Sequence, residues 1–316
     1  MTAETTEFAT TRRRGLSFGG GLYGQALGVL IREKPLGLFG AIVVILFIFA
    51  AIAAPLITPT GPNTISYDPA DRFAGPGLAH LFGTDNLGRD VYTRVVYGAR
   101  VSMTISMVAV ATSTVISLVL GIVSAFFGGW VDTAIQRFVD AFIAFPGLIL
   151  ILAVVAIFRE TQAPFLPAEG LFRTENVLLM VTIGTLLGVG SSRIIRGSTL
   201  VIINETYVEA ARSLGASNAR IMWGYILPNV MAPMITLATL GLGAAILIEA
   251  SLSYLGLGVP PDVATWGGML NREARAFMTQ APWLAIFPGL ALSLAVFGFN
   301  MLGDALRDVL DPRLRG

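Results

Sequence analysis

Six long stretches without a charged residue dominate the pattern of hydrophobic and polar positions in this chain. A helix needs about 20 predominantly apolar residues to cross the roughly 30 Å hydrocarbon core of a bilayer. The stretches fit this length, the fourth being the shortest, and they cover residues 36–57, 101–131, 141–158, 176–192, 221–248 and 276–303. The pattern therefore predicts six transmembrane helices, with the charged residues placed in the loops between them.

The composition excludes several other classes of protein. Charged residues make up 13% of the 316 residues and hydrophobic residues 54%, whereas soluble domains carry about 25% charged residues. A soluble globule, a disordered chain and a nucleic-acid-binding protein are excluded on this ground, and the net charge of +1 predicts no acidic partner. Arg12, Arg13 and Arg14 precede the first apolar stretch as in a signal peptide. That stretch is longer than the about 7–15 apolar residues of a signal peptide and no small-residue cleavage site follows it, so we interpret it as a retained span.

The distribution of lysine and arginine predicts how the spans are oriented. Cytoplasmic loops carry an excess of these residues, and the side that holds both termini has 13 of them against 8 on the other side. We therefore expect a multi-pass protein of the cell membrane with both termini in the cytoplasm, embedded in the lipid bilayer. The predicted organisation is a cytoplasmic tail over 1–35, a first helix over 36–57, an outer loop with one amphipathic helix over 58–100, a five-helix core over 101–303 and a cytoplasmic tail over 304–316.

Residue types that carry catalysis are scarce in this chain. It has no cysteine, one histidine, His80, and one lysine, Lys34. Zinc sites draw on several Cys, His or acidic ligands, so His80 is interpreted as a loop residue. A phosphate-binding P-loop needs a lysine after a glycine, whereas Lys34 follows Glu33. The predicted spans contain no pair of carboxylates and no Ser–His pair, so we expect no catalytic site, metal site or cofactor in this chain.

The segment between the fourth and fifth stretches predicts a helix-turn-helix. Four apolar residues recur at helical spacing and give a first helix one apolar face: Tyr207, Val208, Ala211 and Leu214. Glu209 and Arg212 lie on its polar flank, Gly215 suits a left-handed cap, and Ser217 can begin a second helix. From the pattern alone, the segment is either an interfacial helix that seals the bundle or a surface that a partner approaches closely at small residues such as Ala210.

The residues of this segment resemble the coupling loop of ABC-importer permeases. The resemblance rests on Glu209-Ala210-Ala211, on Gly215 three residues after Arg212, and on Ile226-Leu227-Pro228. Longer stretches are similar to the C-type permease of dipeptide, oligopeptide and nickel importers, namely 82–90, 97–100, 207–217, 249–258, 266–267 and 311–313. The resemblance covers roughly residues 30–316. The loop over 159–175 is longer than in that family, and 188–192 lacks the expected tryptophan and alanine.

This resemblance implies a fold, partners and site residues. The fold is an all-α membrane protein of the type I ABC importer permease class, with six transmembrane helices and a cytoplasmic coupling helix-turn-helix. The implied partners are a second homologous permease, two ABC ATPase subunits that bind ATP and magnesium, and a periplasmic or lipid-anchored substrate-binding protein. Within a coupling loop over 196–229, the implied ATPase-coupling residues are Glu205, Tyr207, Val208, Glu209, Ala210, Ala211, Leu214, Gly215, Ala216, Ser217, Ile221 and Pro228. The implied substrate is a di- or oligopeptide, with nickel or another small solute as the alternative.

Two further groups of residues are candidates for function. Glu249 is an acid within a predicted helix, where ionisable residues are costly. We predict a gating or structural role for it, with substrate contact or a solvated position near the outer interface as alternatives. Asp85, Arg89, Asp90 and Arg94 alternate with apolar residues and predict an amphipathic helix on the outer membrane face that also docks a binding protein. An ion-coupled secondary transporter would need acidic sites in two matching repeats, which Glu249 alone does not provide.

Overall fold

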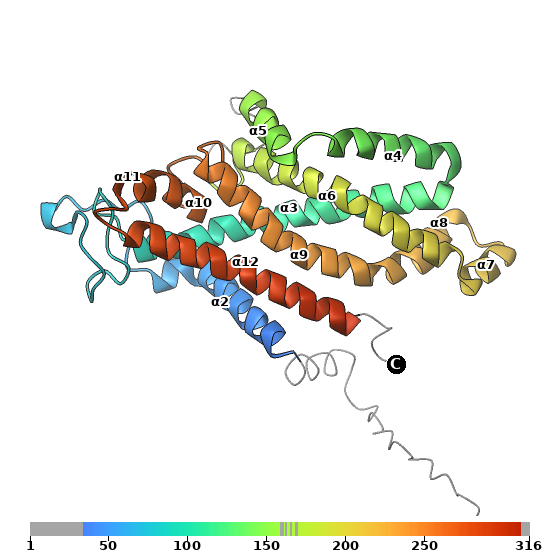
Figure 1. The fold of residues 1–316 in the computed structure, drawn as a ribbon, viewed down its shortest axis with the longest axis horizontal. Coiled ribbons are helices and arrows are strands. Elements are labelled where there is room, and N and C mark those ends of the chain that lie inside the picture. The colour runs from blue at the N-terminus through green and yellow to red at the C-terminus, as the bar shows by residue number, and fades with distance from the viewer. Residues whose placement is uncertain (1–33, 159–160, 162, 165, 168–169, 311–316) are drawn as a thin grey trace, which may run out of the picture.

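Long helices packed side by side form the body of the molecule in the computed structural model, which describes residues 34–158, 161, 163–164, 166–167 and 170–310 (Figure 1). Within these residues five helices are long and apolar enough to cross a membrane. They are α2 (Pro35–Ile57), α3 (Val91–Phe127), α6 (Thr174–Ile203), α9 (Leu227–Tyr254) and α12 (Trp283–Leu310). The number of spans is six if the bent pair of α4 (Gly129–Ile143) and α5 (Gly147–Phe158) forms one span. The all-helical membrane fold is therefore confirmed. Predictions for residues 1–33 and 311–316 lie outside the described residues.

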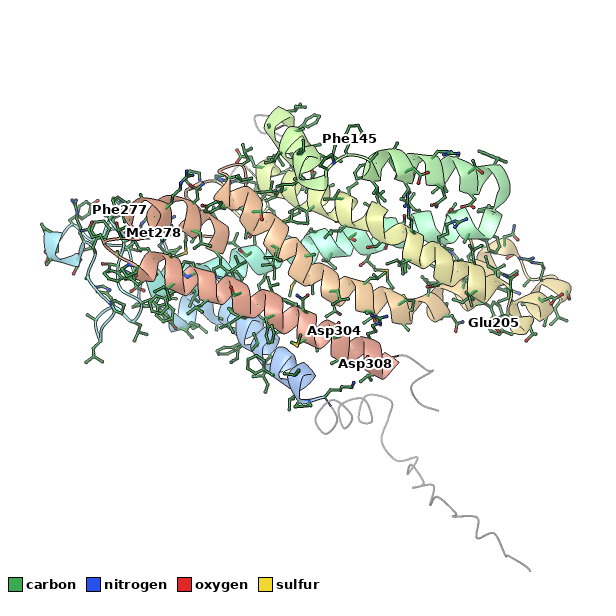
Figure 2. All side chains as sticks on the ribbon, viewed as in Figure 1. Phe145, Glu205, Phe277, Met278, Asp304 and Asp308 are labelled. Carbon is green, nitrogen blue, oxygen red and sulfur yellow. The ribbon has the colours of Figure 1, made fainter. Side chains whose placement is uncertain are left out.

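Short helices lie at the two ends of this bundle. One end carries α7 (Thr206–Ser213), α8 (Asn218–Ile221) and the π-helical turn η2 (Met222–Ile226). The opposite end carries the 3-10 turn η1 (Pro69–Asp71), α10 (Trp266–Met269), the π-helical turn η3 (Leu270–Ala274) and α11 (Arg275–Phe277). Figure 2 shows the separation, with Glu205 at one end and Phe277 and Met278 at the other.

The third predicted span is not a single helix over 141–158. Helix α4 already begins at Gly129 and includes the predicted loop 132–140, and the chain then bends by 85° between α4 and α5. Pro146 lies in this bend. A proline has no N–H to continue the helical ladder and disfavours helical backbone at the residue before it. The helix therefore ends at Ile143 and a new one starts at Gly147.

The second span begins earlier than predicted, at Val91. Asp90 caps α3, because its carboxylate accepts a hydrogen bond from the Thr93 N–H at 2.8 Å. The preceding residues form a turn closed by a bridge between Thr84 and Asp90. The amphipathic helix predicted over 85–94 on the membrane surface is therefore wrong, since Arg94 belongs to a buried face of the long helix α3. At the other terminus α12 continues to Leu310, so the predicted tail over 304–316 begins as helix.

Small residues allow the helices α3 and α6 to pack closely. A Cβ atom added to Gly184 would lie 2.5 Å from the carbonyl oxygen of Ala109, and one added to Gly188 would lie 2.8 Å from that of Ser113. Helix interfaces in membranes are enriched in such residues because they let backbones approach. The stretch 188–192, unusual in sequence, thus contributes a glycine to the contact with the central helix α3.

This contact predicts a difference between two glycines of α6. Gly184→Val places side-chain atoms against the backbone of α3, where no rotamer change relieves the clash, and overpacking of this kind costs about 1–3 kcal/mol. No described heavy atom lies within 4 Å of a Cβ at Gly190, so Gly190→Val is the matched control. We expect a lower thermal unfolding midpoint for Gly184→Val in detergent and little change for Gly190→Val. Equal midpoints for the two variants would show that the α3–α6 contact is looser than described.

Candidate functional site

The predicted helix-turn-helix is present as α7 and α8, and its inner side is anchored in the bundle. Val208 of α7 and Ile221 of α8 are fully buried. They pack in one apolar cluster with Ile226, with Ile122 of α3 and with Ile195 of α6. Burying an aliphatic side chain stabilises a fold by about 1.5–3 kcal/mol. The same cluster continues into the start of α9. The short helices are therefore attached to the three long helices α3, α6 and α9, and they do not form a free loop.

The turn between α7 and α8 depends on the backbone of Gly215. Its φ is +80°, in the left-handed region that favours glycine. The Gly215 N–H donates to the Arg212 carbonyl at 3.0 Å and the Ala216 N–H donates to the Ala211 carbonyl at 3.1 Å, the two bonds of a Schellman cap. The Ser217 hydroxyl then accepts from the Arg220 N–H at 3.4 Å and caps α8. The predicted left-handed cap and N-cap are both confirmed.

The outer side of α7 is exposed and carries acidic and small residues. Glu205, Glu209, Ala210 and Leu214 are exposed, whereas Ala211 is buried. The predicted apolar face is therefore divided, because Leu214 is 89% exposed at the end of the helix while Val208 and Ala211 point inward.

Tyr207 lies at the edge of this exposed side, stacked on Tyr225 with ring centroids 6.4 Å apart. Burial, together with the negative charge of Glu205, raises the pKa of the Tyr207 hydroxyl above its ordinary value. The hydroxyl is therefore neutral at physiological pH.

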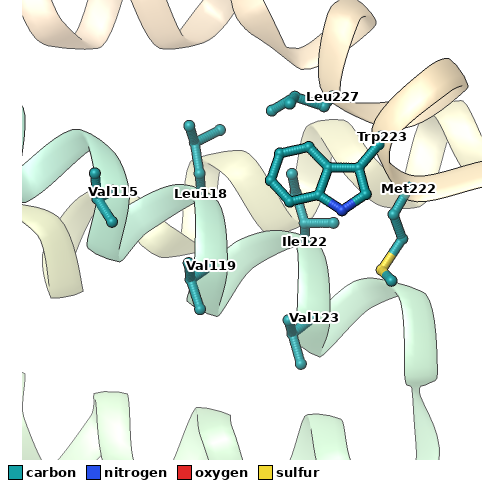
Figure 3. Close-up of a pocket in the computed structure, with 8 residues that line it drawn as sticks. All are labelled: Val115, Leu118, Val119, Ile122, Val123, Met222, Trp223 and Leu227. Carbon is teal, nitrogen blue, oxygen red and sulfur yellow. The ribbon is translucent and has the colours of Figure 1, made fainter. Parts of the chain in front are cut away.

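Helix α8 continues into the fifth span through the π-helical turn η2. Pro228, at the start of α9, has no N–H to donate. The side-chain amide of the next residue, Asn229, donates to the Tyr225 carbonyl at 2.6 Å. An apolar cavity of about 300 Å³ lies beside this junction (Figure 3). Its lining comes from α3 and the α8–α9 junction: Val115, Leu118, Val119, Ile122, Val123, Met222, Trp223 and Leu227. These side chains offer no charged group to a polar ligand.

Glu249 is fully buried between α3 and the end of α9. One carboxylate oxygen accepts from the Ser102 hydroxyl at 2.9 Å and the other from the Ser253 hydroxyl at 2.7 Å. The Ser253 oxygen in turn accepts from the Val259 N–H at 3.3 Å. Glu249 therefore joins two spans to the segment that follows α9. Its burial contradicts the alternative of a solvated position, while the gating or structural role stays a prediction.

The four residues predicted to dock a binding protein lie together but point into the chain. Asp85, Asp90 and Arg94 are buried, and Arg89 is nearly so. Arg89 donates to Asp85 at 2.6 Å and to Glu273 at 2.6 Å, so it joins the turn before α3 to η3. A protein that approaches this end would first meet exposed side chains of the preceding segment such as Tyr67 and Leu78.

Several charged contacts were not predicted from the sequence. Glu273 accepts from both Arg89 and Arg94, at 2.6 and 3.4 Å. Asp132 of α4 accepts two hydrogen bonds from Arg196 of α6. Residues far apart in sequence form these pairs, so no spacing rule finds them. The available signal was the scarcity of charge, because a charge in or beside a span requires a partner.

Comparisons with known proteins agree on one family. Residues 117–316 match the family described as the inner membrane component of binding-protein-dependent transport systems. Residues 31–76 match the N-terminal transmembrane domain of oligopeptide transport permease C. The chain is 39% identical over 285 residues to a dipeptide transport system permease protein of Alkalihalophilus pseudofirmus, which covers 90% of this chain and 88% of that one. It is 41% identical over 286 residues to a glutathione transport system permease protein of Escherichia coli, covering 90% and 89%.

Proposed function

The chain belongs to the inner membrane components of binding-protein-dependent transport systems, and from this premise we propose that it takes up di- or oligopeptides under the control of ATPases that dock on α7 and α8. The coarser function is established by the family: the chain is a multi-pass permease component of an ABC importer and is not itself catalytic. ATP is bound by partner ATPase subunits, and within the described residues no group of three acidic or histidine side chains could hold a metal.

The observation that carries the docking proposal is that α7 and α8 have one exposed side and one side buried in the bundle. The outer side presents Glu205, Glu209 and Ala210 to solvent. The inner side is fixed by Val208 and Ile221 in the cluster that includes α3 and α6. A partner that pushes on the outer side therefore displaces the ends of three spans together. This is what a coupling element requires, because a flexible loop would absorb the push.

The mechanism follows from this rigid connection. Closure of two ATPases on ATP would bring the α7–α8 elements of this chain and of a second, homologous permease together. The attached spans would then rock as bodies and exchange an inward-open for an outward-open arrangement, each nucleotide state favouring one of the two. Glu249 would help each bundle to move as one unit, since it ties α3 to α9 through Ser102 and Ser253.

The orientation belongs to the same proposal. We place α7 and α8 on the cytoplasmic side with both termini, because that side holds 13 of the 21 basic residues. The turn before α3 and the helices α10 and α11 then face outward. A soluble binding protein would deliver substrate there, against exposed parts of the segment 58–82.

The names of the relatives support a peptide-like substrate. One relative is a dipeptide permease and another a glutathione permease, and glutathione is itself a small peptide. The test is uptake of a labelled dipeptide by proteoliposomes that contain this chain with its partner permease, ATPases and binding protein. We expect uptake that requires ATP and the binding protein, and no ATP hydrolysis by this chain alone. Uptake driven by an ion gradient without ATP would identify a secondary transporter instead.

A further inference from the structure

Helix α4 is joined to its neighbours by a turn at each end. It follows α3 through Gly128 and Gly129, whose φ angles of +60° and +51° lie in the left-handed region. No described heavy atom lies within 4 Å of a Cβ at either glycine, so no surrounding side chain packs against the turn at these positions. At its other end α4 meets the 85° bend to α5, where Figure 2 labels Phe145. The position of α4 is therefore weakly determined by its covalent connections.

Apolar packing also holds α4 weakly. Of its fifteen residues, Val139 is the one that is buried. Trp130 is 82% exposed and Phe138 is 55% exposed, so these two large side chains do not pack on the body of this chain, whereas Phe142, near the end of the helix, lines the cavity between α5 and α6. The helix lies along α3 and α6 in Figure 1 without being enclosed by them. Its place in the molecule must depend on other contacts.

Those contacts are ion pairs with α6. Arg196 donates through Nε to Asp132 Oδ1 at 2.7 Å and through Nη2 to Asp132 Oδ2 at 2.5 Å, a two-bond fork that fixes orientation as well as distance. The Ser124 hydroxyl of α3 donates to the same carboxylate. About two helical turns further along α4, Asp140 accepts a hydrogen bond from Arg193 of α6. Asp132 thus holds the start of α4 to α6 at the end of the bundle where α7 and α8 lie.

Helix α6 leads directly into the coupling helix. It ends at Ile203 and α7 begins at Thr206. The Glu205 N–H donates back to the Ile202 carbonyl at 3.1 Å, and Ile195 shares the buried cluster with Val208. A displacement of α7 is therefore passed to the last turns of α6, which include Arg196.

We propose that the Asp132–Arg196 pair is the positioning link that makes α4 follow α6, so that a push on α7 reaches the bent pair α4–α5. This inference rests on the proposed docking of ATPases on α7 and α8. Its consequence lies at the bend, where α5 and α6 enclose an apolar cavity of about 180 Å³ between residues such as Ile151 and Leu186. When α4 moves with α6 this cavity keeps its shape, and when the link is broken α5 separates from α6.

The test uses the full transporter with spin labels on α4 and α6. The chain has no cysteine of its own, so Phe138→Cys and Ile194→Cys, both at exposed positions, supply the labels. Without further change we expect one narrow distance distribution in each nucleotide state. Asp132→Asn and Arg196→Gln should broaden it and reduce dipeptide uptake roughly 5- to 30-fold, with ATPase co-purification unchanged. The double variant that exchanges the two residues, Asp132→Arg with Arg196→Asp, should restore most of the narrow distance distribution and most of the uptake.

Arg137→Gln is the matched control on the same helix, because Arg137 is exposed and its nearest acid, Asp140, is 3.9 Å away. Normal uptake in the Asp132 and Arg196 variants, or lost uptake with an unchanged α4–α6 distance, would overturn the proposal. Failure of the exchange variant to restore the narrow distribution would also overturn it. If the unmodified chain does not bind the ATPases, the proposed function is refuted. The α4–α6 distances in the variants would still show whether the Asp132–Arg196 pair holds α4 to α6.

Discussion

Gly215→Val should reduce ATP-driven uptake at least tenfold while leaving the chain inserted in the membrane. The φ of +80° at this position is strained for a β-branched residue, at a cost of about 1–3 kcal/mol. The turn relieves that strain by losing its two cap hydrogen bonds, which turns α7 relative to α8. Because the turn lies outside the long helices, we expect normal insertion, at least a tenfold loss of uptake, and reduced co-purification of the ATPases.

The controls for this variant separate backbone strain from crowding. No described heavy atom lies within 4 Å of a Cβ at Gly215 or at Gly197, and Gly197 has ordinary helical backbone. Gly197→Val should therefore transport normally. Gly215→Asn should retain most activity, because asparagine tolerates the left-handed region. A Gly215→Val chain that binds its ATPases and transports normally would disprove a coupling role for this turn.

Glu273→Ala should strongly destabilise the opposite end of the molecule. Its carboxylate receives hydrogen bonds from Arg89 and Arg94, and the side chains of all three residues are at most 13% exposed. Removing one partner of a buried ion pair costs about 3–5 kcal/mol, because the remaining charge stays desolvated. That is a large share of the about 5–15 kcal/mol that separates folded from unfolded proteins. We expect a sharp fall in the thermal unfolding midpoint and in the yield of folded protein.

Glu175→Ala is the matched control for this loss. Its side chain is 37% exposed and its carboxylate lies 3.9 Å from Arg173, and exposed pairs contribute about 0–1 kcal/mol. Its unfolding midpoint should stay close to that of the unmodified chain. If both variants unfold at the same temperature, the buried pairs with Glu273 do not stabilise the outer end.

The sequence predicts the spans and the coupling turn well because both depend on local properties. Length and absence of charge decide whether a helix can cross a bilayer. The left-handed backbone at Gly215 and the cap at Ser217 follow from the conformational preferences of single residues. The exposure of Leu214 was not foreseen, because periodicity does not show where α7 ends.

The remaining features depend on contacts between distant segments. Uncharged runs do not reveal a break in a helix, although Pro146 was a local signal for the bend between α4 and α5. The charges of Asp85 and Arg94 suggested a surface helix, yet the structure buries them beside Glu273. That partner lies 179 residues from Arg94 in the chain. Whether such a charged residue is exposed or buried therefore depends on tertiary packing, which a local sequence pattern does not contain.

The docking of ATPases on α7 is tested most directly by chemical cross-linking. Ala210→Cys places a thiol on the exposed side of α7 in a chain without other cysteines, and Trp130→Cys places one on α4 as the control. In membranes that contain the assembled transporter, we predict that a short thiol–amine cross-linker joins the ATPase to Cys at position 210 and not to Cys at position 130. An assembled, ATP-hydrolysing transporter in which position 210 forms no cross-link to the ATPase, while position 130 does, would contradict the account.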